Sequence, residues 1–330
     1  MKNRFLHGSE KLVDPMTVGA VHFFQPLFAM LPLSLQRRML EGASSKTPYM
    51  GFVVEPYAMF LFYRIADHER AQALLPDGFK LARSRVFEDG SEEHYAIVSL
   101  FRVHASTFWG SRAELYLIAE NQETGLLSWV IADYLSDTVS YDRANGLRGP
   151  SAPGAVITTS ADGRVVVDLS DTRGERAVAF DAKLANAALR PLDARLWVEG
   201  NLSVAYGPKL SPDHAGTFAL TFTPDEMTEA LDIPLDDLRL ERMTWHDDML
   251  EDAPTCVACF PFAQHLLSDS PGSGSGYAST DELEKAVASV DFDSIPKFST
   301  PPVRKGLVVS TVMTAALVGV LAIALATRAR

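Results

Sequence analysis

The sequence predicts a mainly β protein of the α+β class, built as a large antiparallel barrel or sandwich with a few short helices. Short apolar runs rich in Val, Ile, Phe and Tyr recur between residues 48 and 267, as is typical of β-strands. Turn-forming pairs such as Asp89-Gly90 and Asp162-Gly163 separate several of these runs. Helical patterns in the same region are few, so the helices are expected at the periphery of the sheet.

Eleven segments carry the strand pattern, either as apolar runs or by alternating with period two. The stretches VITTS and RVVVDL flank Asp162-Gly163 and predict a hairpin with a two-residue turn. The expected strands are 58–64, 80–87, 94–104, 113–120, 126–133, 155–160, 165–169, 177–184, 196–206, 217–222 and 257–262.

Three short helices are expected within this β region, at 67–74, 225–230 and 234–240. For the first of them, Asp67 is the expected N-cap, and Pro76 follows its end.

Composition and charge exclude several classes of protein. The chain has 330 residues, of which 47% are hydrophobic and 22% charged, as is typical of globular proteins. Two cysteines cannot form the disulfide framework of a small secreted fold. The net charge of −12 argues against nucleic acid as a partner, because phosphate binding requires a basic surface.

Residues 1–47 form an apolar N-terminal segment, in which the 22 residues from Pro15 to Gln36 carry no charge. Glu10 and Asp14 do not fit the basic start of a signal peptide. Two interpretations remain open. The segment either forms a helix that is broken at its prolines and lies on a membrane or on the body, or it crosses the bilayer as a second span.

The C-terminal residues predict a membrane anchor at 304–330. Residues 307–327 are 21 uncharged residues flanked by Arg304, Lys305, Arg328 and Arg330, and a helix of this length spans the ~30 Å hydrocarbon core. Two basic residues lie on each side, so the orientation stays open. Residues 304–330 hold four basic and no acidic residues, so the charge of the remainder is −16.

Residues 268–303 are expected to link the β domain, residues 48–267, to this anchor. SDSPGSGSG at 268–276 has the composition of a flexible linker, and 281–290 predicts one short helix. With no signal peptide, the protein is expected to be a single-pass membrane protein whose main domain lies in the cytoplasm.

Few residues form a recognisable chemical motif. Cys256 and Cys259 form a CxxC pair without a second pair nearby, so two buried structural thiols are expected rather than a redox or zinc site. His246-Asp247-Asp248 is expected to be an exposed turn, although it could orient an imidazole. Nucleotide-binding and hydrolase motifs are absent from the sequence, and neither a metal nor a cofactor is expected.

Arg64 and Glu114 place charges at the edges of two apolar strands. In a barrel, such positions either point into the mouth or end a strand in solvent. A carboxylate in an apolar pocket has a shifted pKa and can perform acid–base chemistry.

The segment at 57–81, YAMFLFYRIADHERAQALLPDGFKL, and the strand FWGSRAELYLIAE at 108–120 resemble segments of the acetoacetate decarboxylase-like superfamily. LLSWVIADYLSD at 126–137 and the turn Gly-Leu-Arg-Gly-Pro at 146–150 complete the resemblance, which covers roughly residues 55–265. The resemblance implies a β-barrel or cone of antiparallel strands around an apolar cavity, with peripheral helices.

The family's catalytic lysine, which forms a Schiff base with a β-keto acid, is missing at the matching position. The sequence there reads GLRGPS, and no lysine lies between Lys80 and Lys183. Arginine stays protonated and cannot replace the lysine. The resemblance therefore implies a divergent member in which Arg148 and Arg64 bind a carboxylate and Glu114 lines the pocket.

Three functions follow from these observations. The chain is expected to be a membrane-tethered barrel that binds a small apolar or amphiphilic, lipid-like carboxylate without Schiff-base decarboxylase activity. Alternatively, it is a lysine-independent lyase, hydratase or isomerase on a keto or enoyl substrate, with Glu114 as its base and an arginine holding the carboxylate. The third alternative is a membrane-anchored scaffold, which a cavity filled by side chains would favour.

Overall fold

The computed structural model describes residues 2–44, 49–105, 108–142, 146–210, 216–269 and 272–295. They belong to one compact unit, residues 1–295; a second unit, residues 296–330, lies outside the described residues, as does the predicted anchor at 304–330. Within the described ranges, every helix is too short or too polar to cross a bilayer.

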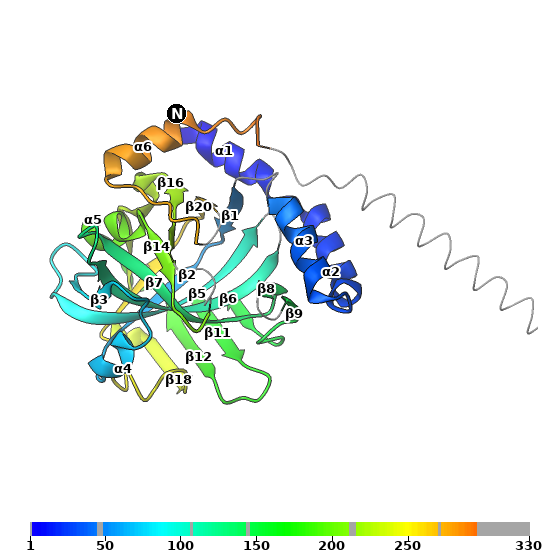
Figure 1. The fold of residues 1–330 in the computed structure, drawn as a ribbon. Helices are drawn as coiled ribbons and strands as arrows, with labels where there is room; N and C mark the ends of the chain where they lie inside the picture. The colour runs from blue at the N-terminus through cyan, green and yellow to red at the C-terminus, as the bar shows by residue number, and fades with distance from the viewer. Residues whose placement is uncertain are drawn as a thin grey trace, which may run out of the picture. The chain divides into compact units, whose positions relative to one another are not determined.

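A fourteen-stranded sheet forms the centre of the fold (Figure 1). Along its main path the strand order is β13-β17-β19-β2-β5-β6-β7-β14-β15, and β1, β3, β4, β16 and β20 pair alongside this path. Its strands are β1 (Met50–Val54), β2 (Ala58–Arg64), β3 (Phe79–Leu81), β4 (Arg83–Ser84), β5 (Glu93–Ala105), β6 (Trp109–Asn121), β7 (Leu127–Ser136), β13 (Ala188–Pro191), β14 (Val204–Tyr206), β15 (Thr217–Phe218), β16 (Leu220–Phe222), β17 (Glu229–Asp232), β19 (Cys256–Phe260) and β20 (Gln264–Ser268).

Two smaller sheets and short helices complete the body. One sheet has the order β10-β11-β12-β18, and β8 pairs with β9. These strands are β10 (Val156–Thr159), β11 (Arg164–Ser170), β12 (Ala177–Lys183), β18 (Leu238–Met243), β8 (Ser140–Asp142) and β9 (Gly146–Arg148). The helices are α1 (Lys2–Leu12), α2 (Pro15–Ala29), α3 (Leu33–Ser44), α4 (His68–Gln72), α5 (Ala194–Trp197) and α6 (Thr280–Ser289), with the 3₁₀ turns η1 (Glu199–Asn201), η2 (Pro224–Met227) and η3 (Leu235–Asp237).

Strand β2 shows why the central strands are apolar along their whole length. Met59, Leu61 and Tyr63 belong to one hydrophobic core, and the alternate residues Phe60 and Phe62 belong to another. Successive side chains of a strand point to opposite faces, so a sheet that lies between two cores needs apolar residues at every position.

The large sheet is not closed into a barrel, which corrects the barrel or cone expected from the sequence. Its main path ends at β13 and β15. The sheet forks at β5: residues 95–100 of β5 pair with β2, whereas 103–105 pair with β1. Glu55, Pro56 and Tyr57 separate β1 from β2, and proline cannot donate a ladder hydrogen bond. Most pairs are antiparallel, as expected, but β14 runs parallel to β7.

Most of the expected strands are confirmed, and β2 has the expected bounds. The segment 196–206 is an exception, because α5 and η1 precede the short strand β14. The Asp193 side chain accepts a hydrogen bond from the Leu196 backbone N–H at 3.1 Å, so an N-cap turns this apolar run into a helix. The segment 80–87 is divided into β3 and β4.

Turns and helix starts follow local chemistry. The hairpin between β10 and β11 is confirmed, but its loop has three residues, because Ser160 pairs with Arg164; Gly163 supplies the left-handed residue at φ 76°. Asp67 caps α4 as expected. The helices expected at 225–230 and 234–240 are the turns η2 and η3, each followed by a strand.

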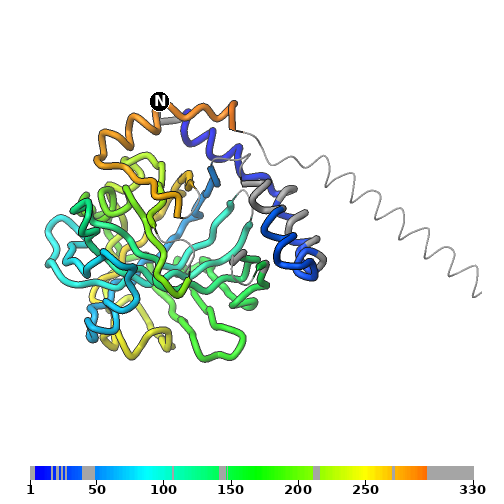
Figure 2. Tube along the Cα trace, viewed as in Figure 1, coloured from blue at the N-terminus to red at the C-terminus, as the bar shows by residue number. Residues whose placement is uncertain are grey.

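Residues 272–295 pack onto the body, whereas a flexible linker was expected at 268–303; residues 270–271 and 296–303 of that linker lie outside the described residues. Helix α6 lies at the expected place and buries Leu283. Phe5 of α1 packs edge-to-face on Phe292 at 5.7 Å, and Val290 and Ile295 share the same buried cluster. The first and last described segments therefore lie side by side (Figure 2).

The N-terminal segment forms three helices in place of one long span. Helix α2 continues through Pro26 and ends at Ala29, ahead of Pro32, and α3 begins at Leu33. Helix α2 has only fifteen residues, too few for the second membrane span that the sequence left open.

Candidate functional site

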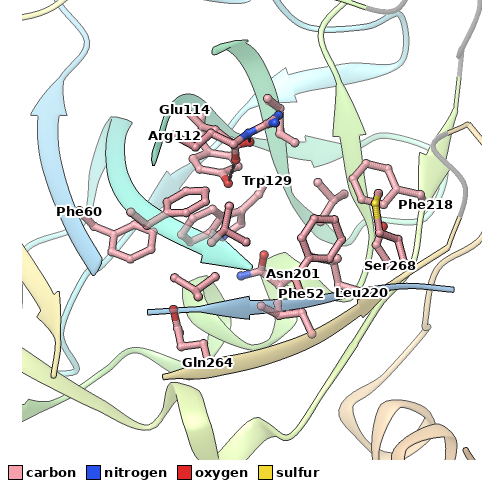
Figure 3. A pocket seen from close by; sticks show the side chains of 18 of the residues that line it. Phe52, Phe60, Arg112, Glu114, Trp129, Asn201, Phe218, Leu220, Gln264 and Ser268 are labelled. Carbon is pink, nitrogen blue, oxygen red and sulfur yellow. Dashed lines mark hydrogen bonds and ion pairs between the residues drawn. The ribbon is translucent and has the colours of Figure 1, made fainter. Parts of the chain in front are cut away.

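A cavity of about 180 Å³ lies at the fork of the large sheet (Figure 3). Strands β1, β16 and β20 line one side, and β5, β6 and β7 line the other. Most of the lining side chains are aromatic or aliphatic. The cavity is therefore open space in the core, and the condition that favoured a scaffold, a cavity filled by side chains, is not met.

Aromatic rings form the floor of the cavity. Phe60, Trp129 and Trp197 contact one another with ring centroids 5.2–6.1 Å apart. The indole N–H of Trp129 donates to the Leu196 carbonyl, and that of Trp197 to the Val86 carbonyl, each at 2.8 Å. Because both indole N–H groups are satisfied, these side chains offer only apolar surface to the cavity.

Strands β1 and β20 form a thin wall between the cavity and helix α1. Phe52 and Leu266 line the cavity and pair across the two strands. The alternate residue His265 points to the other side, where its Nε2 lies 3.2 Å from Glu10 of α1. Strand alternation thus separates the cavity face from the helix face of this wall.

The charged groups of the cavity come from one face of β6. Arg112, Glu114 and Tyr116 are spaced two residues apart, so their side chains project on the same side. Glu114 accepts hydrogen bonds from Arg112 Nε and from the Tyr116 hydroxyl. Its residue exposure is only 6%, so this ion pair is buried inside an apolar pocket.

Arg112 is held in place by aromatic rings as well as by Glu114. Its guanidinium carbon lies 4.3 Å from the ring centroid of Tyr134 and 5.8 Å from that of Phe108, within cation–π range. Burial alone would lower the pKa of Arg112, but the charge and hydrogen bond of Glu114 raise it above its usual value. Arg112 is therefore a permanent cation.

The terminal nitrogens of Arg112 are available to a ligand. Among the described residues, Arg112 forms one ion pair and one hydrogen bond, and both use Nε. Figure 3 shows the guanidinium beside the cavity. In a guanidinium, Nη1 and Nη2 together present the fork that binds a carboxylate.

Two phenols complete this corner. Burial raises the pKa of Tyr206 to about 12. Burial, followed by the charge of Glu114 and the hydrogen bond to it, raises the pKa of Tyr116 well above its usual value. Both are neutral at physiological pH, so the cavity lining at this corner contains one cation, one carboxylate and two phenols.

A few neutral polar groups lie elsewhere in the cavity. Asn201 Nδ2 donates to the Trp197 carbonyl at 3.0 Å, and Ser268 Oγ donates to the Asp269 carbonyl at 2.9 Å. In Figure 3, Gln264 lies across the cavity from Arg112 and Glu114. These groups offer hydrogen bonds but no charge.

The structure brings only one of the three predicted site residues into the cavity. Glu114 lines it, but Arg64 is exposed at the end of β2, where it pairs with Glu93 at 3.7 Å. Arg148 is exposed on β9 and does not line the cavity. The arginine beside Glu114 is Arg112, which period-two alternation along β6 could have identified, because it lies two residues before Glu114.

The other sequence candidates lie outside the cavity lining. Cys256 and Cys259 are free thiols, and burial raises the pKa of each to about 12. His246 Nε2 lies 3.0 Å from Asp133, and its side chain is only 18% exposed, so the expected exposed turn is partly buried. No group of three metal-ligating side chains occurs in the described ranges.

Comparisons with known proteins give little further information. No family model and no curated protein matches the chain. Among solved structures, the chain is similar to an acetoacetate decarboxylase from Legionella pneumophila, with 13% identity over 68% of this chain and 87% of that chain, and a TM-score of 0.43. A likeness this weak assigns neither a family nor an activity, so the resemblance noted in the sequence stays a prediction.

Proposed function

We propose that the protein binds a small, mostly apolar carboxylate in the cavity, with the carboxylate on Nη1 and Nη2 of Arg112. The observation that supports this proposal is a buried arginine that lines a mostly apolar cavity and whose ion pair with Glu114 uses only Nε. A pocket with apolar walls and a few placed polar groups is typical of small-molecule sites.

The size of the cavity limits the apolar part of the ligand. An apolar cavity of ~150 Å³ holds a benzene molecule, so 180 Å³ suits a chain or ring of about six carbons. Longer chains would have to extend out of the cavity. Each buried CH₂ contributes about 0.8 kcal/mol, or roughly fourfold in affinity.

The charges favour a carboxylate over a neutral head group. At ~4 Å, two opposite charges near a protein surface attract by about 4 kcal/mol. Desolvation of the carboxylate and repulsion from Glu114 oppose this attraction. We therefore expect a carboxylate to bind about tenfold more tightly than its primary amide, which corresponds to ~1.4 kcal/mol.

Tryptophan fluorescence tests the proposal, because Trp129 and Trp197 line the cavity. The full chain in digitonin, a detergent with a bulky body, is titrated with straight-chain carboxylates from butanoate to dodecanoate and with the matching amides. We expect affinity to rise up to about six carbons and then to level off. Equal affinity for acid and amide would contradict the role of Arg112.

Two variants assign the binding to the cavity. Arg112→Met combined with Glu114→Gln removes both charges together and should abolish the preference for the acid. Arg64→Met, which removes an exposed arginine outside the cavity, is the matched control and should leave binding unchanged.

Catalysis by Glu114 is a second candidate, because this carboxylate lies in the cavity beside an arginine and a tyrosine. A lyase, hydratase or isomerase could use Glu114 as its base. Both Glu114 oxygens are occupied by donors, however, so proton abstraction would require Arg112 or Tyr116 to move. Turnover of enoyl or keto acids that is lost in Glu114→Gln while binding remains would favour the enzyme.

The proposal includes no Schiff-base chemistry, because the sequence has no lysine between Lys80 and Lys183. The membrane tether remains part of the proposal and rests on the uncharged run 307–327. A tethered body can take an amphiphilic ligand directly from the bilayer.

A further inference from the structure

Helices α2 and α3 expose an unusual amount of apolar surface. Nine large apolar side chains are exposed in the described ranges, and four of them lie within thirteen residues, on the two helices and the turn that joins them. They are Phe23, 62% exposed, Phe28, 36%, Met30, 82%, and Leu35, 42%. We call these four side chains the apolar edge. Patches of this kind mark interaction sites on soluble domains.

The helix pair is fixed to the body at its other side, so the apolar edge is not a consequence of undocked helices. Both helices pack against β9. A Cβ at Gly146 of β9 would lie 2.6 Å from Gln36 Oε1 and 3.0 Å from Leu33 Cδ1. Gln36 is 9% exposed, and its Nε2 donates to the Leu31 carbonyl at 2.8 Å.

The sequence around the apolar edge is suited to hydrocarbon. No charge occurs from Pro15 to Gln36, and the pair Arg37-Arg38 follows at once. Basic side chains at the end of an apolar segment can reach the headgroups. An uncharged run with exposed Phe and Met, followed by basic side chains, is therefore compatible with the interfacial region of a bilayer.

The C-terminal sequence indicates which partner is near. Residues 307–327 have the length and composition of a bilayer anchor. Eleven residues, 296–306, join it to the described body, and they reach at most ~40 Å. A body of this length has a radius of gyration of about 19 Å. A bilayer that holds residues 307–327 would therefore lie within about one body diameter.

We propose that the apolar edge of α2 and α3 inserts into the interfacial region of a lipid bilayer and gives the tethered body a second membrane contact. The body outside the anchor is strongly acidic, so anionic headgroups repel it. Insertion therefore depends on apolar burial, and we expect it on phosphatidylcholine vesicles without anionic lipid and at high salt.

Site-directed labelling tests the contact in the full chain. Met30→Cys carries a fluorescent label, and the chain is reconstituted into phosphatidylcholine vesicles and isolated by flotation. We expect iodide in the water to quench this label several-fold less than in digitonin, and nitroxide-bearing lipids to quench it strongly. The unsubstituted chain reports background labelling of Cys256, which is partly exposed, and of the buried Cys259.

Leu189→Cys is the matched control, because Leu189 is 51% exposed on the edge strand β13. Its label should remain open to iodide. A further variant carries the label on Phe23→Cys and also contains Met30→Glu. The new charge should prevent insertion, so iodide should reach this label. The proposal is overturned if position 30 stays open to iodide on vesicles. It is also overturned if position 30 is shielded without quenching by nitroxide lipid, which indicates a protein cover, or if the chain does not float.

Discussion

The ion pair between Arg112 and Glu114 is expected to make the two residues strongly dependent on each other for stability. Their side chains are only 13% and 8% exposed, so water cannot solvate one charge when the other is removed. Arg112→Met leaves the Glu114 carboxylate buried and uncompensated, which costs about 3–5 kcal/mol. Glu114→Gln leaves the Arg112 charge instead, and we expect a loss of similar sign.

The double variant should recover much of this loss. With both charges removed, Met and Gln fill space similar to that of the Arg112 and Glu114 side chains. The amide oxygen of Gln can still accept a hydrogen bond from the Tyr116 hydroxyl. We expect the double variant to lie within about 1–2 kcal/mol of the wild type, because exchanging a buried pair for neutral groups is often nearly neutral. The coupling between the two sites is then at least ~2 kcal/mol.

Thermal unfolding in digitonin, followed by circular dichroism, measures this cycle. A loss of 3–5 kcal/mol corresponds to a fall in Tm of roughly 6–10 °C in a domain of this size. The double variant should regain most of that fall. If the double variant instead loses the sum of the two single losses, the two side chains do not act as a buried pair, and the description of the cavity corner is wrong.

Three further predictions concern other parts of the body. Burial alone would lower the pKa of His265, but hydrogen bonds and charges from Glu226 and Glu10 raise it. The stabilising effect of the protonated imidazole is complete below pH ~6.5 and is lost as the pH rises through the folded-state pKa. The Tm should therefore fall with rising pH more steeply in the wild type than in His265→Gln. Gly146→Ala forces a side chain into a left-handed conformation at φ 77°, and we expect a loss of about 1–2 kcal/mol in a thermal melt. Burial raises the pKa of both cysteines of β19, so a thiol reagent such as DTNB at pH 8 should react only after unfolding; rapid reaction of the native chain would contradict that burial.

Local chemistry allowed much of the fold to be predicted. Alternation and apolar composition gave β2 its exact bounds, and Asp67 capped the expected helix. The segment 196–206 was predicted as a strand because its composition is apolar, but the cap at Asp193 makes its first part helical. The open sheet could not be predicted, because it depends on β5 changing partners between two strands far apart in sequence.

Of the residues that line the cavity, the sequence singled out only Glu114 as a candidate. Glu114 stands out as a charge in an apolar strand, and it does line the cavity. Arg64 and Arg148 were chosen by resemblance and by position at strand ends, which does not determine the direction of a side chain. Arg112 was missed, although its spacing from Glu114 places both on one face of β6.

Native mass spectrometry of the full chain, released from digitonin after incubation with hexanoate, tests the central claim most directly. We expect one hexanoate per chain in the wild type and in Arg64→Met, and no bound hexanoate in the variant that combines Arg112→Met with Glu114→Gln. A wild type without bound hexanoate, or equal occupancy in that double variant, would contradict a carboxylate site on Arg112.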